Sequence, residues 1–542
     1  MTTTGSGASP GGAETAPAAG APAEPKPKIG WIFLSVMLTM LLGALDQTIV
    51  STALPTIVGE LNGLEHLSWV VTAYMLAATV GMPIYGKAGD LFGRKRVFLF
   101  AIGVFLVGSV LCGMAQDMTQ LILFRALQGI GGGGLMISAQ AIIADVVPAR
   151  ERGRYMGMMG GVFGLASIAG PLLGGFFTDH LDWRWIFYIN LPLGAVALAT
   201  AALVLRLPRP SGPRPRLDYA GTVLLAAAST CIVLFTSWGG GEYAWTSPVV
   251  IGLGAGSVLF AALFVLAELR AEEPVIPLSL FRDRDFVLTA LIGVTVGIAM
   301  FSTVSYLPTF LQMVNGASAT ESGLMMLPMV AGMLTATITS GRAISRTGRY
   351  KAWPVAAMPT IAAGLVLLSR MDAGTSYLYN AAGMLVLGLG VGMVMQNLVL
   401  IVQNSAPRRH LGTATSANNY FRQIGASFGI AVFGSVFVGR LNEQMAAAPP
   451  GGGLEVQGGE AGIGSLTPEM LQALPAPARE FVVNAFAEAL PPVFLYALPL
   501  LAAGFVLALL LKEKPLGTEV AAEEPEAGSP RGGDGDRTPV PA

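Results

Sequence analysis

The chain has 542 residues, of which 53% are hydrophobic and 12% are charged, and its mean hydropathy is +0.62. Soluble globular proteins carry about 25% charged residues, so this composition excludes a water-soluble fold of this size. The formal net charge of −1 and the lack of a basic stripe argue against nucleic acid as a partner.

The apolar residues are grouped in blocks of about 20, the length that crosses a ~30 Å hydrocarbon core. They predict an all-α polytopic membrane protein with 14 transmembrane helices, since Gly and Pro within a block are tolerated in membrane helices. The predicted spans cover residues 31–58, 68–86, 97–116, 120–146, 155–178, 185–206, 218–238, 248–267, 286–312, 322–341, 352–369, 376–402, 411–438 and 492–511.

The segments before and after these spans differ from them in composition. Residues 1–30 are rich in Ala, Pro, Gly and Thr, and residues 512–542 have a similar bias, so we expect two disordered tails. Cys112 and Cys231 lie inside predicted spans and the three histidines are scattered. Neither a disulfide framework nor a metal site is therefore indicated.

Lysine and arginine residues favour every second connection between the spans. One set of connections holds the basic residues of 87–96, 150–154, 206–216, 270–284, 342–351 and 408–409, whereas the other set holds Arg184, Arg370, Arg440 and Arg479. Because basic loops stay in the cytoplasm, both termini are predicted to be cytoplasmic, in a plasma or inner cell membrane. The long connection 439–491 is then expected outside the cell.

Two similar sequences lie in basic connections of the two chain halves, GKAGDLFGRKR at 86–96 and GRAISRTGRYK at 341–351. Repeated halves are typical of secondary transporters, whose substrate sites lie near the midplane between the repeats. The second copy has Ser345 where the first has Asp90. Any acidic role at this position therefore belongs to the first half alone.

Gly86, Asp90, Gly93 and Arg94 resemble the loop signature G-x-x-x-D-x-x-G-R of the major facilitator superfamily. Further motifs resemble its fourteen-span drug:proton antiporter branch (EmrB/QacA type), namely LDQTIVSTALP at 45–55, RALQGIG at 125–131 and WRWIFYINLPLG at 183–194. The fifth-span antiporter signature is matched by Gly157, Gly170, Pro171, Gly174 and Gly175, with Ala166 in place of one glycine. The similarity covers nearly all of residues 31–511.

The resemblance implies two pseudo-symmetric six-helix bundles, residues 31–206 and 271–511, linked by two additional helices within 207–270. It implies a monomeric secondary transporter, not an enzyme, that exports amphipathic drugs or other small organic compounds by alternating access. Such multidrug efflux, which underlies antibiotic resistance, is driven by the proton gradient and needs no cofactor. An uptake permease or facilitator on the same fold is the alternative, because the direction rests on analogy.

Three ionisable residues lie well inside predicted spans: Asp46, Arg125 and Arg422. A charged side chain in a membrane is costly, so each is a candidate functional residue. Burial disfavours the charged form of a carboxyl group and a nearby arginine favours it, so Asp46 beside Arg125 is a candidate proton carrier. The resemblance supports Asp46 as the coupling carboxylate and Arg125 as its modulator. A static buried pair that only joins two helices is the alternative.

In the first basic connection, Gly86, Asp90, Gly93 and Arg94 match the family's cytoplasmic gating motif. The resemblance implies that Asp90 and Arg94 latch the two halves together in the outward-facing state. Alternatively, the basic residues of 94–96 only orient the chain in the membrane.

Polar and aromatic side chains of several spans are candidates for lining a substrate cavity. They are Gln128, Tyr306, Gln396, Asn397, Asn418, Tyr420 and Arg422. Arg422 either attracts an anionic substrate group or snorkels toward the cytoplasmic boundary. Gln396 shares a helix face with Gln403, and these amides either line the cavity or bond to neighbouring helices. For Tyr306 the alternative is packing, the commoner role of aromatic residues at helical spacing.

Three motifs mimic enzyme loops. Residues 129–134 fit G-x-G-x-x-G, residues 425–429 fit G-x-S-x-G, and residues 81–88 fit a P-loop except that Ala88 replaces its Ser or Thr. Each lies within or at the end of an apolar span, without the strand that such loops follow. We interpret the glycines of 129–134 as permitting close helix approach or as leaving room beside Arg125.

Overall fold

The computed structural model describes residues 29–61, 67–205, 207, 217–240, 242–446 and 468–517. Within these residues the chain is helical, and its β-structure is limited to an isolated bridge between Gly239 and Tyr243. The predicted all-α class is therefore confirmed. Most of both predicted tails, and residues 447–467 of the predicted outer connection, lie outside the described residues.

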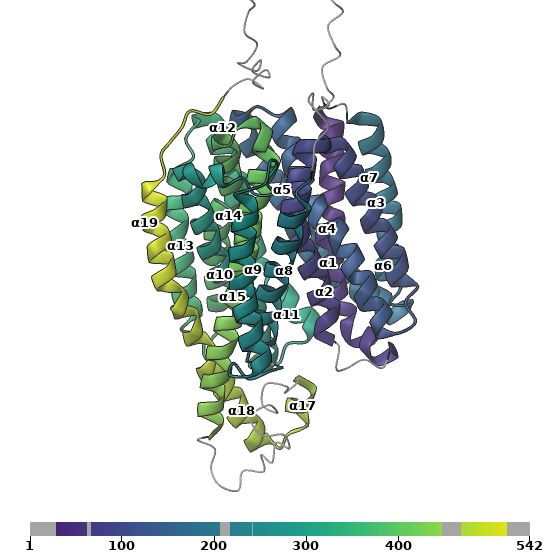
Figure 1. Ribbon diagram of the computed structural model, residues 1–542. Helices are drawn as coiled ribbons and strands as arrows, with labels where there is room; N and C mark the ends of the chain where they lie inside the picture. Colours follow the sequence, from purple (N-terminus) through teal and green to yellow (C-terminus); the bar gives the residue numbers. More distant parts are fainter. Residues whose placement is uncertain are drawn as a thin grey trace, which may run out of the picture.

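The helices run up and down through one bundle (Figure 1). They are α1 (Ile29–Leu61), α2 (Leu67–Phe92), α3 (Arg94–Gly113), α4 (Met118–Val146), α5 (Ala149–His180), α6 (Trp185–Tyr188), α7 (Asn190–Val204), α8 (Tyr219–Trp238), α9 (Pro248–Glu268), η2 (Leu278–Arg282), α10 (Arg284–Met313), α11 (Ala319–Met325), α12 (Leu327–Thr347), α13 (Ala352–Leu368), α14 (Tyr377–Ser405), η3 (Arg408–His410), α15 (Leu411–Ala446), α17 (Pro468–Ala473), α18 (Ala476–Ala489), η4 (Pro491–Ala497) and α19 (Leu498–Leu510).

Thirteen helical stretches in the described part of the chain are long and apolar enough to cross a membrane, and α13 is a shorter apolar helix. Each predicted span thus contains a helix, with differences in detail. The sixth span is divided into α6 and α7 and the tenth into α11 and α12, because Pro192 and Pro328 lack the N–H that would continue the backbone ladder. The thirteenth span is longer than predicted, and α17 and α18 lie in the connection after it.

Two groups of helices stand side by side in the bundle (Figure 1). Helices α1 to α7 pack mainly on one another, and we call them the N-half; α10 to α15 with α19 form the C-half. Helices α8 and α9 pack together, and α8 contacts both α2 of the N-half and α15 of the C-half. The two extra helices therefore cover one side of the junction between the halves.

Both described chain ends lie at the end of the bundle that carries the basic connections, which is at the top of Figure 1. Phe33, near the start of α1, packs edge-on against Tyr155 of α5, with ring centroids 5.0 Å apart. After α19, the carbonyl oxygen of Gly517 accepts a hydrogen bond of 3.1 Å from the backbone N–H of Arg150 in α5. We call this end the basic end, and the charge bias predicts that it is cytoplasmic.

The glycines of 129–134 lie in α4, where α2 and α3 pack against it. A Cβ on Gly129 would lie 2.4 Å from the carbonyl oxygen of Tyr74, and one on Gly131 would lie 2.4 Å from the backbone nitrogen of Phe105. Such contacts are impossible for a larger residue, so these glycines permit close helix approach. Because the stretch is helical, its N–H groups are used within the helix and a phosphate-binding loop is excluded.

We expect the Gly133→Ala variant to lose about 1–3 kcal/mol of unfolding free energy, the usual cost of overpacking. Its added Cβ would lie 2.3 Å from the carbonyl oxygen of Ala78, which is fixed in α2. Gly103→Ala in α3 is the matched control, since nothing lies within 4 Å of its Cβ position. Thermal unfolding of the purified variants in detergent measures the difference, and equal melting temperatures would contradict the close packing.

Helix α5 carries the predicted antiporter motif and lies against helices of both halves. A Cβ on Gly170 would lie 2.1 Å from the hydroxyl oxygen of Thr48 in α1, and one on Gly157 would lie 3.0 Å from the carbonyl oxygen of Thr337 in α12. Ala166, the departure from the motif, is fully buried, and its carbonyl accepts a hydrogen bond of 3.0 Å from Thr48. The small residues therefore let α5 approach α1 and α12 closely.

Candidate functional site

Five polar side chains from four helices meet inside the N-half. Asp46 comes from α1, Ser109 from α3, Arg125 and Gln128 from α4, and Asn190 from the start of α7. Each of them is at most 2% exposed. Polar groups buried this deeply are costly unless they are paired. We call these five residues the Asp46 cluster.

The carboxylate of Asp46 is the central acceptor of the cluster. Its Oδ2 accepts a hydrogen bond from Nη1 of Arg125 at 2.7 Å, and its Oδ1 accepts from Nε2 of Gln128 at 2.7 Å and from Nδ2 of Asn190 at 2.9 Å. Both amides also donate to the hydroxyl of Ser109, Asn190 at 2.9 Å and Gln128 at 3.2 Å. The donors of three side chains are thus directed at the two oxygens of one carboxyl group.

Arg125 is held by further contacts besides its carboxylate. Nη1 also donates to Oε1 of Gln128 at 2.8 Å, and Nε donates to the carbonyl of Val70 at 3.4 Å. The guanidinium lies 4.2 Å from the ring centroid of Tyr74 and 5.9 Å from that of Phe187. Cation–π contacts are strongest where water is excluded, as it is around a side chain that is 2% exposed.

This arrangement can link a proton to a conformational change. With Asp46 ionised, its charge balances that of Arg125. A proton added to Asp46 would leave the guanidinium uncompensated in a low-dielectric interior, which is strongly unfavourable. Protonation would therefore favour a rearrangement that hydrates Arg125 or supplies another anion to it.

The structure brings Asp46 and Arg125 into contact, while their part in proton coupling stays a prediction. Gln128 was expected to line the substrate cavity, but it bonds to Asp46 inside the N-half. Asn190 and Ser109 are not among the residues predicted to form a site. Asn190 was detectable as a polar residue in the apolar sixth span, whereas a lone serine such as Ser109 gives no comparable signal.

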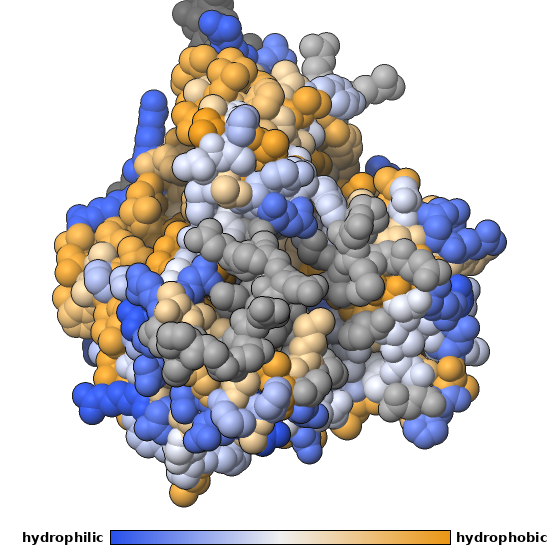
Figure 2. Space-filling view, turned by 90° about the horizontal axis from the view of Figure 1, so that it is seen from below, coloured by the Kyte–Doolittle hydropathy of each residue, from blue (hydrophilic) through white to orange (hydrophobic). Residues whose placement is uncertain are grey.

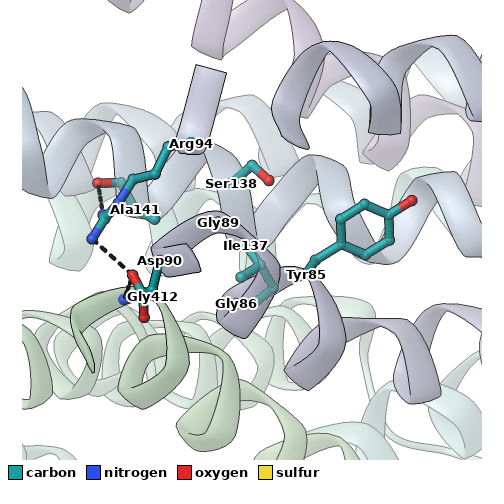
Figure 3. Close-up of a pocket in the computed structure, with 9 residues that line it drawn as sticks. All are labelled: Tyr85, Gly86, Gly89, Asp90, Arg94, Ile137, Ser138, Ala141 and Gly412. Atoms are coloured by element: carbon teal, nitrogen blue, oxygen red, sulfur yellow. Dashed lines mark hydrogen bonds and ion pairs between the residues drawn. The ribbon is translucent and has the colours of Figure 1, made fainter. Parts of the chain in front are cut away.

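At the basic end, Asp90 of α2 lies against the N-terminus of α15 (Figure 3). Its Oδ1 accepts a hydrogen bond from the backbone N–H of Gly412 at 3.0 Å, and its Oδ2 accepts from the N–H of Thr413 at 2.8 Å and from the Thr413 hydroxyl at 2.9 Å. Arg94 donates to the same Oδ1 at 3.1 Å. A carboxylate of the N-half therefore caps a helix of the C-half, where the helix dipole favours negative charge.

We call Asp90, Arg94, Gly412 and Thr413 the basic-end latch. Arg94 starts α3 directly after Gly93, whose φ of 92° lies in the left-handed region that favours glycine. Arg94 also donates to the carbonyl of Ala141 and pairs with Asp145 at 2.9 Å, both in α4. The tight turn at Gly93 thus brings Arg94 between Asp90 and α4.

The two halves also approach each other closely beside the latch. A Cβ on Gly86 of α2 would lie 2.1 Å from the hydroxyl oxygen of Ser416 in α15, and one on Gly341 of α12 would lie 2.1 Å from the carbonyl oxygen of Gly153 in α5. The cavity that remains at the latch has a volume of about 10 Å³, space for about one water molecule. The protein is therefore closed at the basic end at these contacts.

Arg422 and the amides of the C-half lie inside the bundle. Arg422 is 6% exposed, and its Nη2 donates to Oδ1 of Asn419 at 2.7 Å. This bond directs the guanidinium toward the turn of α15 that lies nearer the basic end. Gln396, Asn397 and Asn418 are buried as well.

Tyr420 and Tyr306 make contacts between helices in this state. The hydroxyl of Tyr420 lies 2.7 Å from that of Ser229 in α8, and the hydroxyl of Tyr306 donates to the carbonyl of Ile430 at 2.9 Å. Tyr420 therefore joins α15 to an extra helix, and Tyr306 joins α10 to α15. Neither tyrosine lines the cavity at the latch.

A groove of about 790 Å³ lies between α2, α3, α4 and α8 and is lined almost entirely by apolar side chains. Phe100 and Leu123 on its walls are 62% and 63% exposed, so it faces outward from the N-half toward the lipid. None of the residues predicted to line a substrate cavity belongs to this groove or to the cavity at the latch. Their role in substrate binding stays a prediction.

Comparison with known proteins places this architecture in a family. The family model of the Major Facilitator Superfamily matches residues 36–430, which include the Asp46 cluster and the latch. The chain belongs to this superfamily. The predicted fold is thereby confirmed, and the protein is a multi-pass membrane protein that transports a small molecule as a secondary transporter and is not an enzyme.

Other members of the superfamily resemble the chain over most of its length. An uncharacterised MFS-type transporter of Mycobacterium tuberculosis is 45% identical over 505 residues, 93% of this chain and 72% of the relative. Multidrug transporter protein MdtP of Bacillus subtilis is 40% identical over 409 residues, 76% of this chain and 75% of the relative. The crystal structure of the human organic anion transporter MFSD10 matches with a TM-score of 0.60 at 17% identity, covering 89% of this chain and 100% of the other, which shows the shared fold.

Proposed function

We propose that this superfamily member is a proton-coupled exporter of amphipathic small molecules, of the fourteen-span drug:proton antiporter branch. The observation that carries the proposal is the fully buried ion pair of Asp46 and Arg125, at 2.7 Å within a cluster of donors. An intramembrane carboxylate of this kind is costly and suits a group that exchanges a proton. Export is supported by the 40% identity to multidrug transporter protein MdtP.

The proposed cycle alternates access between the two ends of the bundle. With the basic end cytoplasmic, the described state is closed to the cytoplasm, and a substrate leaves and a proton enters from the opposite end. Protonation of Asp46 releases Arg125 from its ion pair. Helix α2 carries both Tyr74, which stacks on Arg125, and Asp90 of the latch, with Pro83 between them, so a movement at the cluster reaches the latch along one continuous helix.

Everted membrane vesicles that contain the protein and carry an acid-inside pH gradient test this function. We expect a fluorescent amphipathic dye to accumulate, and nigericin, which collapses the pH gradient, to release it. One-to-one exchange against one pH unit supports about tenfold accumulation. Equilibration that ignores the gradient would instead indicate a facilitator, and accumulation in right-side-out vesicles under an acid-outside gradient would indicate an uptake permease.

A further inference from the structure

Arg422 is a buried cation without a counter-ion in the described part of the chain. No aspartate or glutamate there forms an ion pair with it, in contrast to Arg125 with Asp46. Its hydrogen bond to Asn419 is made by Nη2 to a neutral oxygen, and its Nε has no hydrogen-bond partner among the described residues. An uncompensated guanidinium in a membrane interior is costly and calls for an anionic partner.

Hydrogen bonds to α4 show that this region lies at the junction of the halves. Nδ2 of Asn419 donates to Oε1 of Gln140 in α4 at 2.9 Å. Nε2 of Gln403 in α14 donates to the backbone carbonyl of the same Gln140 at 3.3 Å. Arg422 lies one helical turn beyond Asn419, further from the basic end, and its Cβ lies beside α10, where a Cβ on Gly293 would be 3.7 Å from it.

The helix register places Gln396 at the same depth as Arg422. Nε2 of Gln403 in α14 donates to the hydroxyl of Thr415 in α15 at 3.3 Å, where the two antiparallel helices touch. Two turns further from the basic end, about 10 Å along each helix, the same faces carry Gln396 and Arg422. Oε1 of Gln396 is buried and has no hydrogen-bond partner in the part of the chain that the structure describes.

Asn418 adds a third unpaired group, one turn from Arg422 on the same side of α15. The residue is 1% exposed, and its Nδ2 has no partner. Two donors, Nε of Arg422 and Nδ2 of Asn418, and one acceptor, Oε1 of Gln396, are thus buried without protein partners at similar depth. Buried polar groups in native proteins are normally bonded, so these three neighbouring groups are free to bond to a ligand.

We propose that Arg422, Asn418 and Gln396 form an anion subsite that receives the carboxylate of an amphipathic substrate. The planar fork of a guanidinium matches a carboxylate in two parallel hydrogen bonds, and the Asn418 amide supplies a third donor. Oε1 of Gln396 accepts a hydrogen bond from a hydroxyl or N–H group elsewhere on the substrate. The inference rests on the proposed transport function and names the substrate class.

The subsite separates two tasks between the halves. The N-half holds the carboxylate that exchanges the proton, and the C-half holds the cation that recognises the substrate. Substrate sites of secondary transporters lie near the membrane midplane between the repeats, and Arg422 lies one helical turn from Asn419, which bonds across the junction. A substrate with a carboxylate and an apolar body would compensate the Arg422 charge while it is bound.

Equilibrium binding to the full chain in lipid nanodiscs tests the subsite without a pH gradient. The probes are rhodamine B, which carries a carboxylate, and its ethyl ester, which has the same chromophore without that anion. We expect the wild type to bind the acid at least about tenfold more tightly than the ester, and Arg422→Gln to lose that preference by weakening the acid about 10- to 100-fold. Fluorescence anisotropy against empty nanodiscs measures both affinities.

Two further variants distinguish the subsite from general effects. Arg370→Gln removes an exposed arginine of a connecting loop and should leave the preference for the acid unchanged. Arg422→Lys retains the positive charge but lacks the planar guanidinium, so its preference for the acid should be intermediate. If Arg422→Gln does not fold, Arg422→Lys is the variant that tests the subsite.

The proposed subsite is wrong if the wild type binds the acid and the ester equally well, or does not bind the acid. It is also wrong if Arg422→Gln and Arg422→Lys both keep the full preference for the acid. The proposed export is tested by a different experiment, and it is wrong if energised vesicles show no gradient-dependent flux. Because the binding measurement uses no gradient, a failure of the subsite is distinguishable from a failure of export.

Discussion

The Asp46→Asn variant is expected to lose proton-driven transport by about 100-fold or more, the scale of breaking a buried ion pair. Asp46 accepts hydrogen bonds from Arg125, Gln128 and Asn190 with its two carboxylate oxygens. Asparagine has the same shape but offers one oxygen, cannot exchange a proton and leaves Arg125 without a counter-charge. Dye accumulation in everted vesicles, normalised to the amount of folded protein, measures the loss.

Two comparisons locate the effect at this carboxylate. Asp46→Glu retains an ionisable group and should keep part of the activity. Asp117→Asn changes an exposed aspartate at the N-terminus of α4, where an asparagine oxygen still caps the helix, so full transport is expected. Gradient-driven transport that survives in folded Asp46→Asn protein would favour the static pair, in which Asp46 only fixes α1 to α4.

The Asp90→Asn variant is expected to open the basic-end latch. Replacing the carboxylate weakens charged hydrogen bonds to Gly412 and Thr413 and removes the negative charge from the N-terminus of α15. Losing charge-assisted bonds of this kind shifts an equilibrium by about 10- to 100-fold. Labelling of a Ser416→Cys reporter by a water-soluble maleimide should accelerate by that factor, since Ser416 is fully buried in the closed state.

Asp145→Asn is the matched control for the latch. Asp145 pairs with Arg94 at 2.9 Å, but no bond joins it to the N-terminus of α15 in the described residues. The variant should therefore change the labelling rate much less than Asp90→Asn does. The reporter is placed in a background without Cys231, the more accessible of the two cysteines. Equal labelling rates in the wild type and Asp90→Asn would show that Asp90 does not hold the halves together.

The succession of helices could be predicted because it depends on local properties of the chain. Hydropathy sets which segments enter a membrane, and the arginines of alternate connections set their expected orientation. The sequence does not predict the breaks before Pro192 and Pro328. Membrane helices tolerate proline, so a proline within an apolar block does not show that the helix is interrupted there. The glycines of α4 were interpreted correctly since small residues at helical spacing indicate close packing.

The partners of the site residues were less predictable. Asp46 and Arg125 are 79 positions apart, and their pairing was inferred from resemblance and from their shared rarity as intramembrane charges. Gln128 shares a helix face with Arg125, yet that periodicity does not say whether the face turns to a cavity or to another helix. Asn190 is the first residue of α7, directly after the break that follows α6, and its donation to Asp46 cannot be read from the sequence.

Composition and hydropathy were sufficient to establish a helical membrane protein, its series of spans and the rarity of charge within them. Those properties are sums over neighbouring residues, so they can be read along the chain. A hydrogen bond or an ion pair joins atoms about 3 Å apart, on helices that are distant in sequence. Only the packing of the helices therefore shows that Arg125 has a carboxylate partner and that Arg422 has none in the described chain.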